Sequence, residues 1–455
     1  YNTPLNCISG SIPDTVTSIK FGTSFNKSVD VGHLPPALTS LTLGLSFNRP
    51  LIEGSLPSTL TSLTFGRMFN QYIDSKLPDS ITLLVLGGYG QPIAPSSLPQ
   101  SLTSLTFGYM FNHEIEPGVL PPNLVTLRFG HHFSKDITPY SLPESLRTLT
   151  FGEWYAQPFQ TGSLPPWLLS LSLGSMSPES AANCLPNSLT HLQFNERNVP
   201  TGPLPTGLKT LVNGMISHKT DMPHSLTKLK LRPYFNDQML PFWLPQTLRN
   251  LSLGDMYTQE LLPGTLPFSL TKLTMGTHYN KPIGKGLLPS SIISLTIGHY
   301  MSMPIVFPPN LRYLSMGRME QQFHYLQQLP ESIEEVAITH VPLARPYERS
   351  SPLTCVSPNI NIKYFTMFIE NAPFNVKSTC KLSNIRQLIY NSLGWLASGT
   401  ISTYRVRKLL WMSNGHTSFE YRVIDHHHVL CIGKHSITDS STMFILPYPP
   451  PSPPT

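Results

Sequence analysis

The sequence predicts a β-rich solenoid followed by a small α+β domain, and three observations support this fold class. The stretch Leu56–Asn70 recurs with drift from the first residues to about residue 340. Each copy begins with a Leu-Pro pair or a close variant, and successive prolines are mostly 21 or 22 residues apart. Apolar residues also recur at fixed places within the copies. A fixed period of this size is typical of stacked repeats, none of which can bury its apolar face alone.

Each copy is numbered here from the Leu of its Leu-Pro pair, which is position 1. The sixteen copies begin at Ile12, Leu34, Leu56, Leu77, Leu98, Leu120, Leu142, Leu164, Leu185, Leu204, Met222, Leu244, Leu266, Leu288, Phe307 and Leu329. Positions 5 and 8 are aliphatic in all sixteen, and position 10 is Phe, Leu, Ile or Met except at Asn213. Side chains alternate along a strand, so positions 8 and 10 share one face and positions 7 and 9 the other. Positions 6 to 10 therefore predict a short strand, such as Thr61–Phe65, with Ser and Thr outside.

The end of each predicted strand has its own pattern. Position 11 is Gly in thirteen copies, which favours a turn with a positive φ angle. Position 14 is often aromatic and followed by Asn, as in Phe25-Asn26 and Phe47-Asn48. We expect the aromatic ring in the interior and the Asn bound to turning backbone of a neighbouring coil. No copy has room for a long helix, so the return segment should be irregular or extended.

The repeated residues resemble a known family. The spacing Leu-x-x-Leu-x-(Leu/Phe) resembles a leucine-rich repeat, and the sequence is still more similar to the FNIP repeat, a 22-residue relative. The FNIP stretch stands here as Phe111-Asn112-x-x-Ile115 and Phe47-Asn48-Arg49-Pro50-Leu51. The resemblance covers roughly three quarters of the chain. It implies a curved, right-handed solenoid of leucine-rich-repeat type, with a parallel sheet on one face, that serves macromolecular interaction. It implies no catalytic residue, and some members of the family also carry an F-box.

Composition limits the function classes. Only 12% of the residues are charged, and the formal charge of +6 does not by itself indicate a nucleic-acid partner. The five cysteines are odd in number and widely spaced, which favours a reducing compartment, the cytoplasm. No apolar run is long enough to span a bilayer.

The first copy is preceded by half of another. Tyr1–Leu5 matches positions 14 to 18, so the strand that should precede Tyr1 is missing. We expect the chain to be a fragment that self-associates through this uncovered end, because solenoid ends are normally capped.

The outward strand positions of the first seven copies are mostly Ser and Thr. Stacked Thr residues pair favourably across strands, which favours a structural role. A second interpretation is an ice- or glycan-binding face. Between Leu185 and Met222 the spacing falls to 19 and then 18 residues, Asn195 replaces a Gly, and Asn213 enters the core positions. This irregularity is either ordinary repeat decay or a local change of curvature that marks a functional region.

Basic residues become frequent on the outward positions after this irregular stretch. The candidate partner-binding residues, at or directly after the strand, are Lys209, Lys228, Lys230, Arg232, Arg249, Lys272 and Arg312. The only acidic residues at the equivalent strand positions of this half are Glu334 and Glu335. Neighbouring coils are about 5 Å apart, so these cations should form a stripe on one exposed face. A solvated surface would look the same, but an acidic protein partner is the functional interpretation.

The sequence after the repeats differs in character. We divide the chain into the solenoid, 1–340, a Pro/Ser-rich linker, 341–360, a small α+β domain, 361–446, and a Pro-rich tail, 447–455. The α+β domain should contain strands at Ile362–Ile369, Tyr404–Met412, Ser418–Ile424 and Val429–Ile432, and a helix at Leu382–Ala397.

Catalytic and metal-binding signals are weak. Asp425, His426–His428, Cys431 and His435 suggest a metal site, but three consecutive histidines point in alternating directions, so a polar hairpin is favoured. His131 and His132 follow Gly130 and have no partner that spacing identifies. No nucleophile elbow, phosphate loop or dinucleotide fingerprint stands in a strand-to-helix context. We therefore predict no catalytic residue, cofactor or metal.

The sequence thus predicts a non-enzymatic scaffold that presents its repeat sheet to a protein partner. The family resemblance adds a possible role as substrate receptor in an F-box assembly. The alternative is a structural spacer or a surface-binding repeat protein. No membrane association and no specific nucleic-acid binding is expected.

Overall fold

The computed structural model describes residues 12–74, 77–175, 184–195, 203–214, 222–318, 322–342, 364–370, 403–409, 417–425, 428–435 and 441–447. The chain divides into two compact units, Tyr1–Leu229 and Lys230–Thr455. The incomplete N-terminal coil predicted at Tyr1–Leu5 lies outside the described residues.

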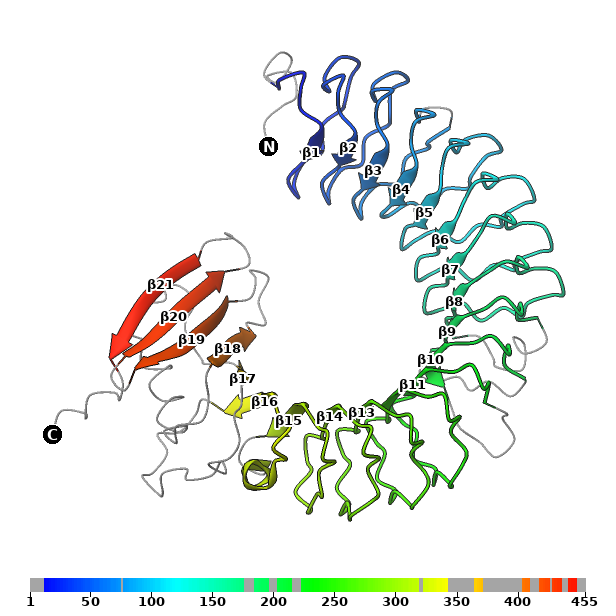
Figure 1. Cartoon of the computed structure of the whole chain (residues 1–455). Coiled ribbons are helices and arrows are strands. Elements are labelled where there is room, and N and C mark those ends of the chain that lie inside the picture. The colour runs from blue at the N-terminus through cyan, green and yellow to red at the C-terminus, as the bar shows by residue number, and fades with distance from the viewer. Residues whose placement is uncertain are drawn as a thin grey trace. The chain divides into compact units, whose positions relative to one another are not determined.

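The first unit is a stack of coils that each contribute one short strand to a parallel sheet (Figure 1). The strands are β1 (Ser18–Lys20), β2 (Ser40–Thr42), β3 (Ser62–Phe65), β4 (Leu83–Leu86), β5 (Ser104–Phe107), β6 (Thr126–Arg128), β7 (Thr148–Thr150), β8 (Ser170–Ser172), β9 (His191–Gln193) and β10 (Thr210–Gly214). Every strand begins at position 7, one residue later than predicted. The register is unshifted, so that Ser40 pairs with Ser62 and Leu41 with Leu63. Equivalent positions therefore lie side by side along the unit.

The second unit begins with parallel strands of the same kind and ends in antiparallel strands. Strand β11 (Lys228–Leu231) spans the boundary between the units. It is followed by β12 (Asn250–Ser252), β13 (Lys272–Thr274), β14 (Ser294–Thr296), β15 (Tyr313–Arg318), the 3-10 helix η2 (Phe323–Gln328), β16 (Glu335–Pro342), β17 (Tyr364–Glu370), β18 (Thr403–Leu409), β19 (Thr417–Asp425), β20 (His428–His435) and β21 (Ser441–Pro447). Neighbouring strands from β12 to β18 pair in parallel, and β18 to β21 pair antiparallel.

The C-terminal strands agree with four of the predicted segments, and β21 was not predicted. The parallel pairing of β16 with β17 and of β17 with β18 means that the repeat sheet extends into the region assigned to the α+β domain. Strand β16 also includes Val341 and Pro342, which the sequence placed in the linker. The predicted helix Leu382–Ala397 and the Pro-rich tail from 448 lie outside the described residues. The division into domains stays a prediction.

The interior is formed by the repeated apolar positions. In the third coil Leu60, Leu63 and Phe65 are buried, as positions 5, 8 and 10 predicted. Position 14, and position 13 in the shorter fourth copy, add a continuous row of buried rings across the first unit, the inner ladder, which consists of Phe25, Phe47, Phe69, Tyr89, Phe111, Phe133 and Tyr155. Centroids of successive rings in this ladder are 5.9 to 6.5 Å apart. Each aromatic ring thus contributes buried area and a stacked contact to the coils on both sides.

Asparagine and serine side chains bind neighbouring coils together. Asn48 Oδ1 accepts a hydrogen bond from the Asn70 N–H of the next coil at 3.0 Å, and Asn26 Oδ1 accepts one from the Asn48 N–H at 2.9 Å. Position 4 makes a second row, in which the Ser101 hydroxyl donates to the Ile81 carbonyl at 2.7 Å. The predicted role of the Asn after the aromatic residue is confirmed. These bonds satisfy turn backbone that has no strand partner.

The prediction for the position-11 glycines was wrong. Positive φ angles occur instead two residues before the next Leu-Pro pair, as at Gly54 and Gly118. Position 11 needs glycine because the coils approach closely there. A Cβ atom on Gly66 would lie 2.2 Å from the Gly44 carbonyl oxygen of the preceding coil. The glycine pattern therefore reports close packing between coils rather than turn geometry.

Asn213 is buried in the core position where the sequence placed it. Its Nδ2 donates to the Phe194 carbonyl at 2.9 Å, which links it to the preceding coil. Its Oδ1 has no hydrogen-bond partner among the described residues. An amide thus replaces the usual apolar side chain where the repeat spacing is shortest.

Candidate partner-binding surfaces

The threonines at position 6 of the first unit donate hydrogen bonds from their hydroxyls to the protein itself. At position 6, the Thr61 hydroxyl donates to the Thr39 carbonyl at 3.1 Å, and Thr82 and Thr103 repeat this bond with the preceding coil at 3.2 and 3.1 Å. These hydroxyls therefore act within the fold. This finding favours the structural interpretation of the threonine array over an ice- or glycan-binding face.

The predicted cations occupy the sheet face in both units. In the first unit Lys209 and Lys228 are both exposed. They lie on neighbouring coils, since the Lys228 N–H donates a hydrogen bond to the Lys209 carbonyl at 3.0 Å. Along β11 the exposed Lys228 and Lys230 alternate with buried Leu229 and Leu231. In the second unit the Arg249 carbonyl accepts from the Lys272 N–H at 2.9 Å, so these two exposed cations are also neighbours.

The other two candidates are more constrained. Arg312 Nε lies 3.6 Å from Glu334 Oε1 and is therefore partly neutralised. Arg232 is half-buried, and its Nε has no hydrogen-bond partner among the described residues. Within the described residues the remaining five cations form no ion pair. A single stripe that includes all seven residues stays a prediction.

A second surface lies on the loops that follow the strands of the first unit. We call it the outer ridge and define it by Arg67, Met68, Tyr109, Met110, His132 and Trp154, all at positions 12 and 13. The backbone fixes these positions from coil to coil, since the His132 N–H donates to the Tyr109 carbonyl at 3.2 Å and the Trp154 N–H to the His131 carbonyl at 3.3 Å. Side chains of successive coils are therefore placed next to one another.

The rings of the outer ridge contact each other in sequence. The Tyr109 and His132 centroids are 4.4 Å apart, and the His132 and Trp154 centroids are 4.5 Å apart. The Arg67 guanidinium carbon lies 5.5 Å from the Tyr109 centroid, within the range of a cation–π contact. Arg67 reaches Tyr109 from two coils away. The intervening coil has Gly88 at position 12, so no side chain stands between them.

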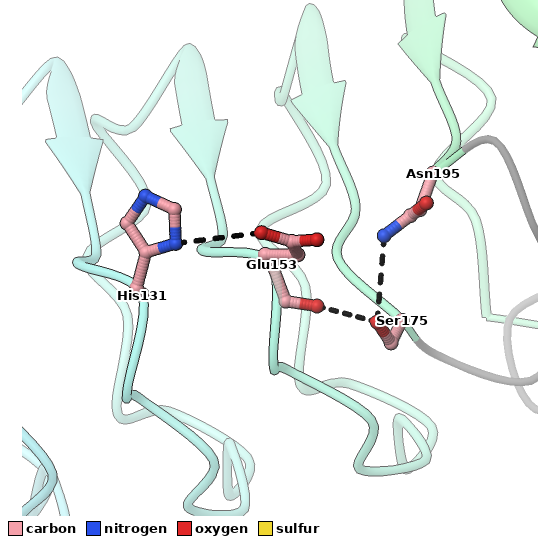
Figure 2. A network of polar contacts seen from close by, with 4 residues as sticks. All are labelled: His131, Glu153, Ser175 and Asn195. Atoms are coloured by element: carbon pink, nitrogen blue, oxygen red, sulfur yellow. Dashed lines mark hydrogen bonds and ion pairs between the residues drawn. The ribbon is translucent and has the colours of Figure 1, made fainter.

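A polar network runs beside the outer ridge, and Figure 2 shows its four residues. His131 Nδ1 lies 3.6 Å from Glu153 Oε2, and the Ser175 hydroxyl donates to the Glu153 carbonyl at 2.5 Å. Asn195 Nδ2 is 3.4 Å from the Ser175 hydroxyl. The network connects four coils and fixes the loop that carries Trp154.

The outer ridge was not predicted from the sequence. The ring contacts of His131 and His132 lie 22 or 23 residues away on neighbouring coils, so spacing within a copy identified no partner for them. A signal was present: large side chains recur at positions 12 and 13, directly before the buried aromatic residue. Reading those positions as a column across the copies would have identified the surface.

Other kinds of site receive no support from the part of the chain that the structure describes. In it, no group of three or more His, Cys, Asp or Glu side chains is arranged to hold a metal ion. Asp425, His428, Cys431 and His435, for which the sequence favoured a polar hairpin over a metal site, belong to strands whose side chains are not described, and His426 and His427 lie outside the described residues. Among the described residues, no helix combines the length and apolar character needed to cross a membrane.

Comparisons with known proteins identify the repeat. No match was found among curated proteins. Among solved structures, the chain is similar to CroV588, described as a novel circular LRR protein, with 28% sequence identity and a TM-score of 0.55. The similarity covers 78% of this chain and 63% of that one, so this chain spans less than two thirds of its length.

The family comparison agrees with the resemblance seen in the sequence. The FNIP repeat model matches residues 1–46, 25–68, 47–89, 69–110, 89–132, 111–154, 133–176, 155–197, 217–256 and 257–300. These overlapping matches span more than half of the chain, and the parallel one-strand coils have the expected architecture. The chain belongs to the FNIP repeat family.

Proposed function

We propose that this chain is a non-catalytic scaffold that binds an acidic protein through the sheet face of its solenoid, in the cytoplasm. The observation that carries the proposal is the pair Arg249 and Lys272, which are exposed on neighbouring coils and form no ion pair within the described residues. Exposed Ile293 and Tyr313 lie on the same face and supply apolar contact area. Repulsion between close cations has a small cost that an acidic partner would remove.

The sheet face suits such a partner for structural reasons. Its strands are fixed in an unshifted parallel register, so the cations are held in place before binding. Little conformational entropy of the backbone would be lost on association. The role of substrate receptor in an F-box assembly stays an expectation from the family resemblance, and the cytoplasmic location rests on the cysteine pattern alone.

Charge reversal tests this proposal. The triple variant Lys228→Glu, Lys230→Glu and Lys272→Glu should remain folded and should lose the salt-sensitive binding partners that the parent chain captures from its native cell. The matched control reverses Lys27, Lys281 and Lys285, which are exposed outside the strands and give the same change in net charge. If the sheet-face variant retains the same partners at the same salt concentration, or if the control loses them equally, the proposal is wrong.

A further inference from the structure

The outer ridge has the composition of a protein-binding site. Trp154, Met68 and Met110 are 57%, 61% and 55% exposed, although each stands directly before a fully buried aromatic residue. Tyr, Trp, Met and Arg are the residue types enriched at the centres of protein interfaces. Exposed apolar residues that are scattered singly need no explanation, but these lie together on coils three to seven of one unit.

The surface is ordered in advance of binding. Trp154 contacts His132, His132 contacts Tyr109, and Arg67 lies over Tyr109. The Glu153 carbonyl and carboxylate are held by Ser175 and His131, which restrains the backbone next to Trp154. Side chains that are already fixed lose little rotamer freedom when a partner binds, which favours affinity.

The ring contacts also limit the class of ligand. Both neighbours of His132 lie within 4.5 Å, centroid to centroid, so they cover ring surface that a sugar or a nucleobase would need for stacking. A peptide needs no flat platform, because its apolar side chains can fit between the exposed thioethers and ring edges. The geometry of the outer ridge therefore suits a peptide better than a glycan or a nucleic acid.

Charge specifies the peptide further. Arg67 is exposed and forms no ion pair within the described residues, whereas the carboxylate of Glu153 is already next to His131. The residues that define the ridge therefore place a permanent positive charge at the Arg67 end. A carboxylate of the ligand would balance this charge and accept charge-assisted hydrogen bonds from the Arg67 guanidinium.

We propose that the outer ridge is a second docking surface, and that it binds a peptide segment of a partner protein with apolar side chains over Met68, Met110 and Trp154 and a carboxylate at Arg67. This surface is distinct from the cationic sheet face, because its residues follow the strands and contribute mainly apolar area.

The test begins with a defined probe. A random peptide library is selected on the whole chain, and the peptide of the enriched consensus is synthesised and titrated by fluorescence anisotropy. We expect a consensus with two or more large apolar residues and at least one Asp or Glu. Trp154→Ala should weaken binding of this peptide by about tenfold or more, as expected for an aromatic interface anchor. Arg67→Gln should weaken it by several-fold.

Two variants serve as controls. Trp167→Ala removes an equally exposed tryptophan of the same unit outside the ridge and should leave the affinity unchanged. The variant Arg67→Glu should not bind the acidic peptide. It should bind a second peptide in which lysines replace the acidic residues. The unfolding curve of each variant, measured in urea, establishes that the fold is retained.

Four outcomes would overturn the inference. One is a library selection that enriches no consensus. Another is a consensus peptide that binds Trp154→Ala as tightly as the parent. The third is a peptide that binds the Trp154→Ala variant but not the sheet-face charge reversal, which would assign it to the sheet face and support the proposed function instead. Binding of chito-oligosaccharide or single-stranded DNA that depends on Trp154, without peptide binding, would also overturn it.

Discussion

In coils three, five, six and seven a residue of the outer ridge directly precedes a residue of the inner ladder, yet the two rows differ in almost every physical respect. Phe69 is fully buried between the rings of neighbouring coils, whereas the preceding residue, Met68, is mostly exposed. Both rows arise from the same unshifted register, which places equivalent residues of successive coils next to each other. The direction of each side chain relative to the core decides whether the row stabilises the fold or is available to a partner.

The two rows also tolerate different residues. The inner ladder contains only Phe and Tyr, because a ring must fill the same space in every coil. The outer ridge contains Arg, Met, Tyr, His and Trp, which no common packing requirement explains. Uniformity within a column of the repeat therefore indicates a structural role, and variety indicates a surface on which function can act. Each prediction below tests a part of this distinction.

The largest difference should appear in stability. Phe69→Ala removes a ring that is 3.8 Å from Phe65 and 6.0 Å from Phe47, centroid to centroid, and leaves a cavity. We expect a loss of about 3–5 kcal/mol in the free energy of unfolding. Met68→Ala, its neighbour in sequence, should cost less than about 1 kcal/mol. Urea unfolding followed by circular dichroism measures both, and equal losses would contradict the separation of the two rows.

The second unit has its own buried stack of rings, Phe235, Tyr257 and Tyr279, which should make the fold sensitive to alkali. Burial raises the pKa of Tyr257 and of Tyr279 from 10 to about 12. The folded state therefore holds these protons more tightly than the unfolded state. The stability they contribute is fully present below pH 10 and is lost as the pH rises from 10 through 12.

We accordingly expect an unfolding transition in this pH range that coincides with the appearance of tyrosinate absorbance. The double variant Tyr257→Phe and Tyr279→Phe should move the transition to higher pH. If both tyrosines titrate near pH 10 while the circular dichroism is unchanged, burial does not raise the pKa of their hydroxyls and the prediction is wrong.

The position-11 glycines lie between the strand and the outer ridge and set the distance between coils for both rows. Gly66→Ala would place a Cβ 2.2 Å from the Gly44 carbonyl oxygen and 2.6 Å from the Leu45 Cα. Backbone must move to relieve this contact, so we expect a loss of about 2–3 kcal/mol. Gly118→Ala, at φ +83° with no atom within 4 Å of the new Cβ, should cost only about 1 kcal/mol. Thermal unfolding of both variants compares the cost of close approach between coils, at Gly66, with the cost of a positive φ angle, at Gly118. A larger loss for Gly118→Ala would contradict this prediction.

The smallest effect concerns an exposed aromatic residue outside both rows. Phe242 has a φ of 67° at a place where six other coils of the described part have a glycine with positive φ, and its side chain is 79% exposed. Phe242→Gly relieves about 1 kcal/mol of backbone strain. It also increases the entropy of the unfolded chain, which costs about 0.5–1 kcal/mol. We expect a stability that is unchanged or slightly raised, in contrast to Phe69→Ala. A clear loss in the unfolding measurement would show that this ring packs within the fold.

Sequence by itself determined the solenoid, its repeat length and its core. The apolar residues at positions 5, 8 and 10 recur so strictly that a strand with one buried face is the only consistent local structure, and the family comparison confirms the repeat. It also located exposed cations on the sheet face, because alternation along a strand fixes which side chains face outward. These properties follow from the recurrence of a local pattern, so aligning the copies with one another is enough to read them.

Only the tertiary structure decided which residues of different coils contact one another. The close approach of Gly66 to Gly44, the sequence of contacts from Arg67 through Tyr109 and His132 to Trp154, and the pairing of β16 with β17 join residues about 20 or more positions apart. Spacing within a copy does not reveal such contacts, since they depend on the register between coils. The contact of Arg67 with Tyr109 also depends on Gly88, which has no side chain to stand between them. The large side chains at positions 12 and 13 of the outer ridge are visible in the sequence, but the contacts among its rings were established only by the stacked coils.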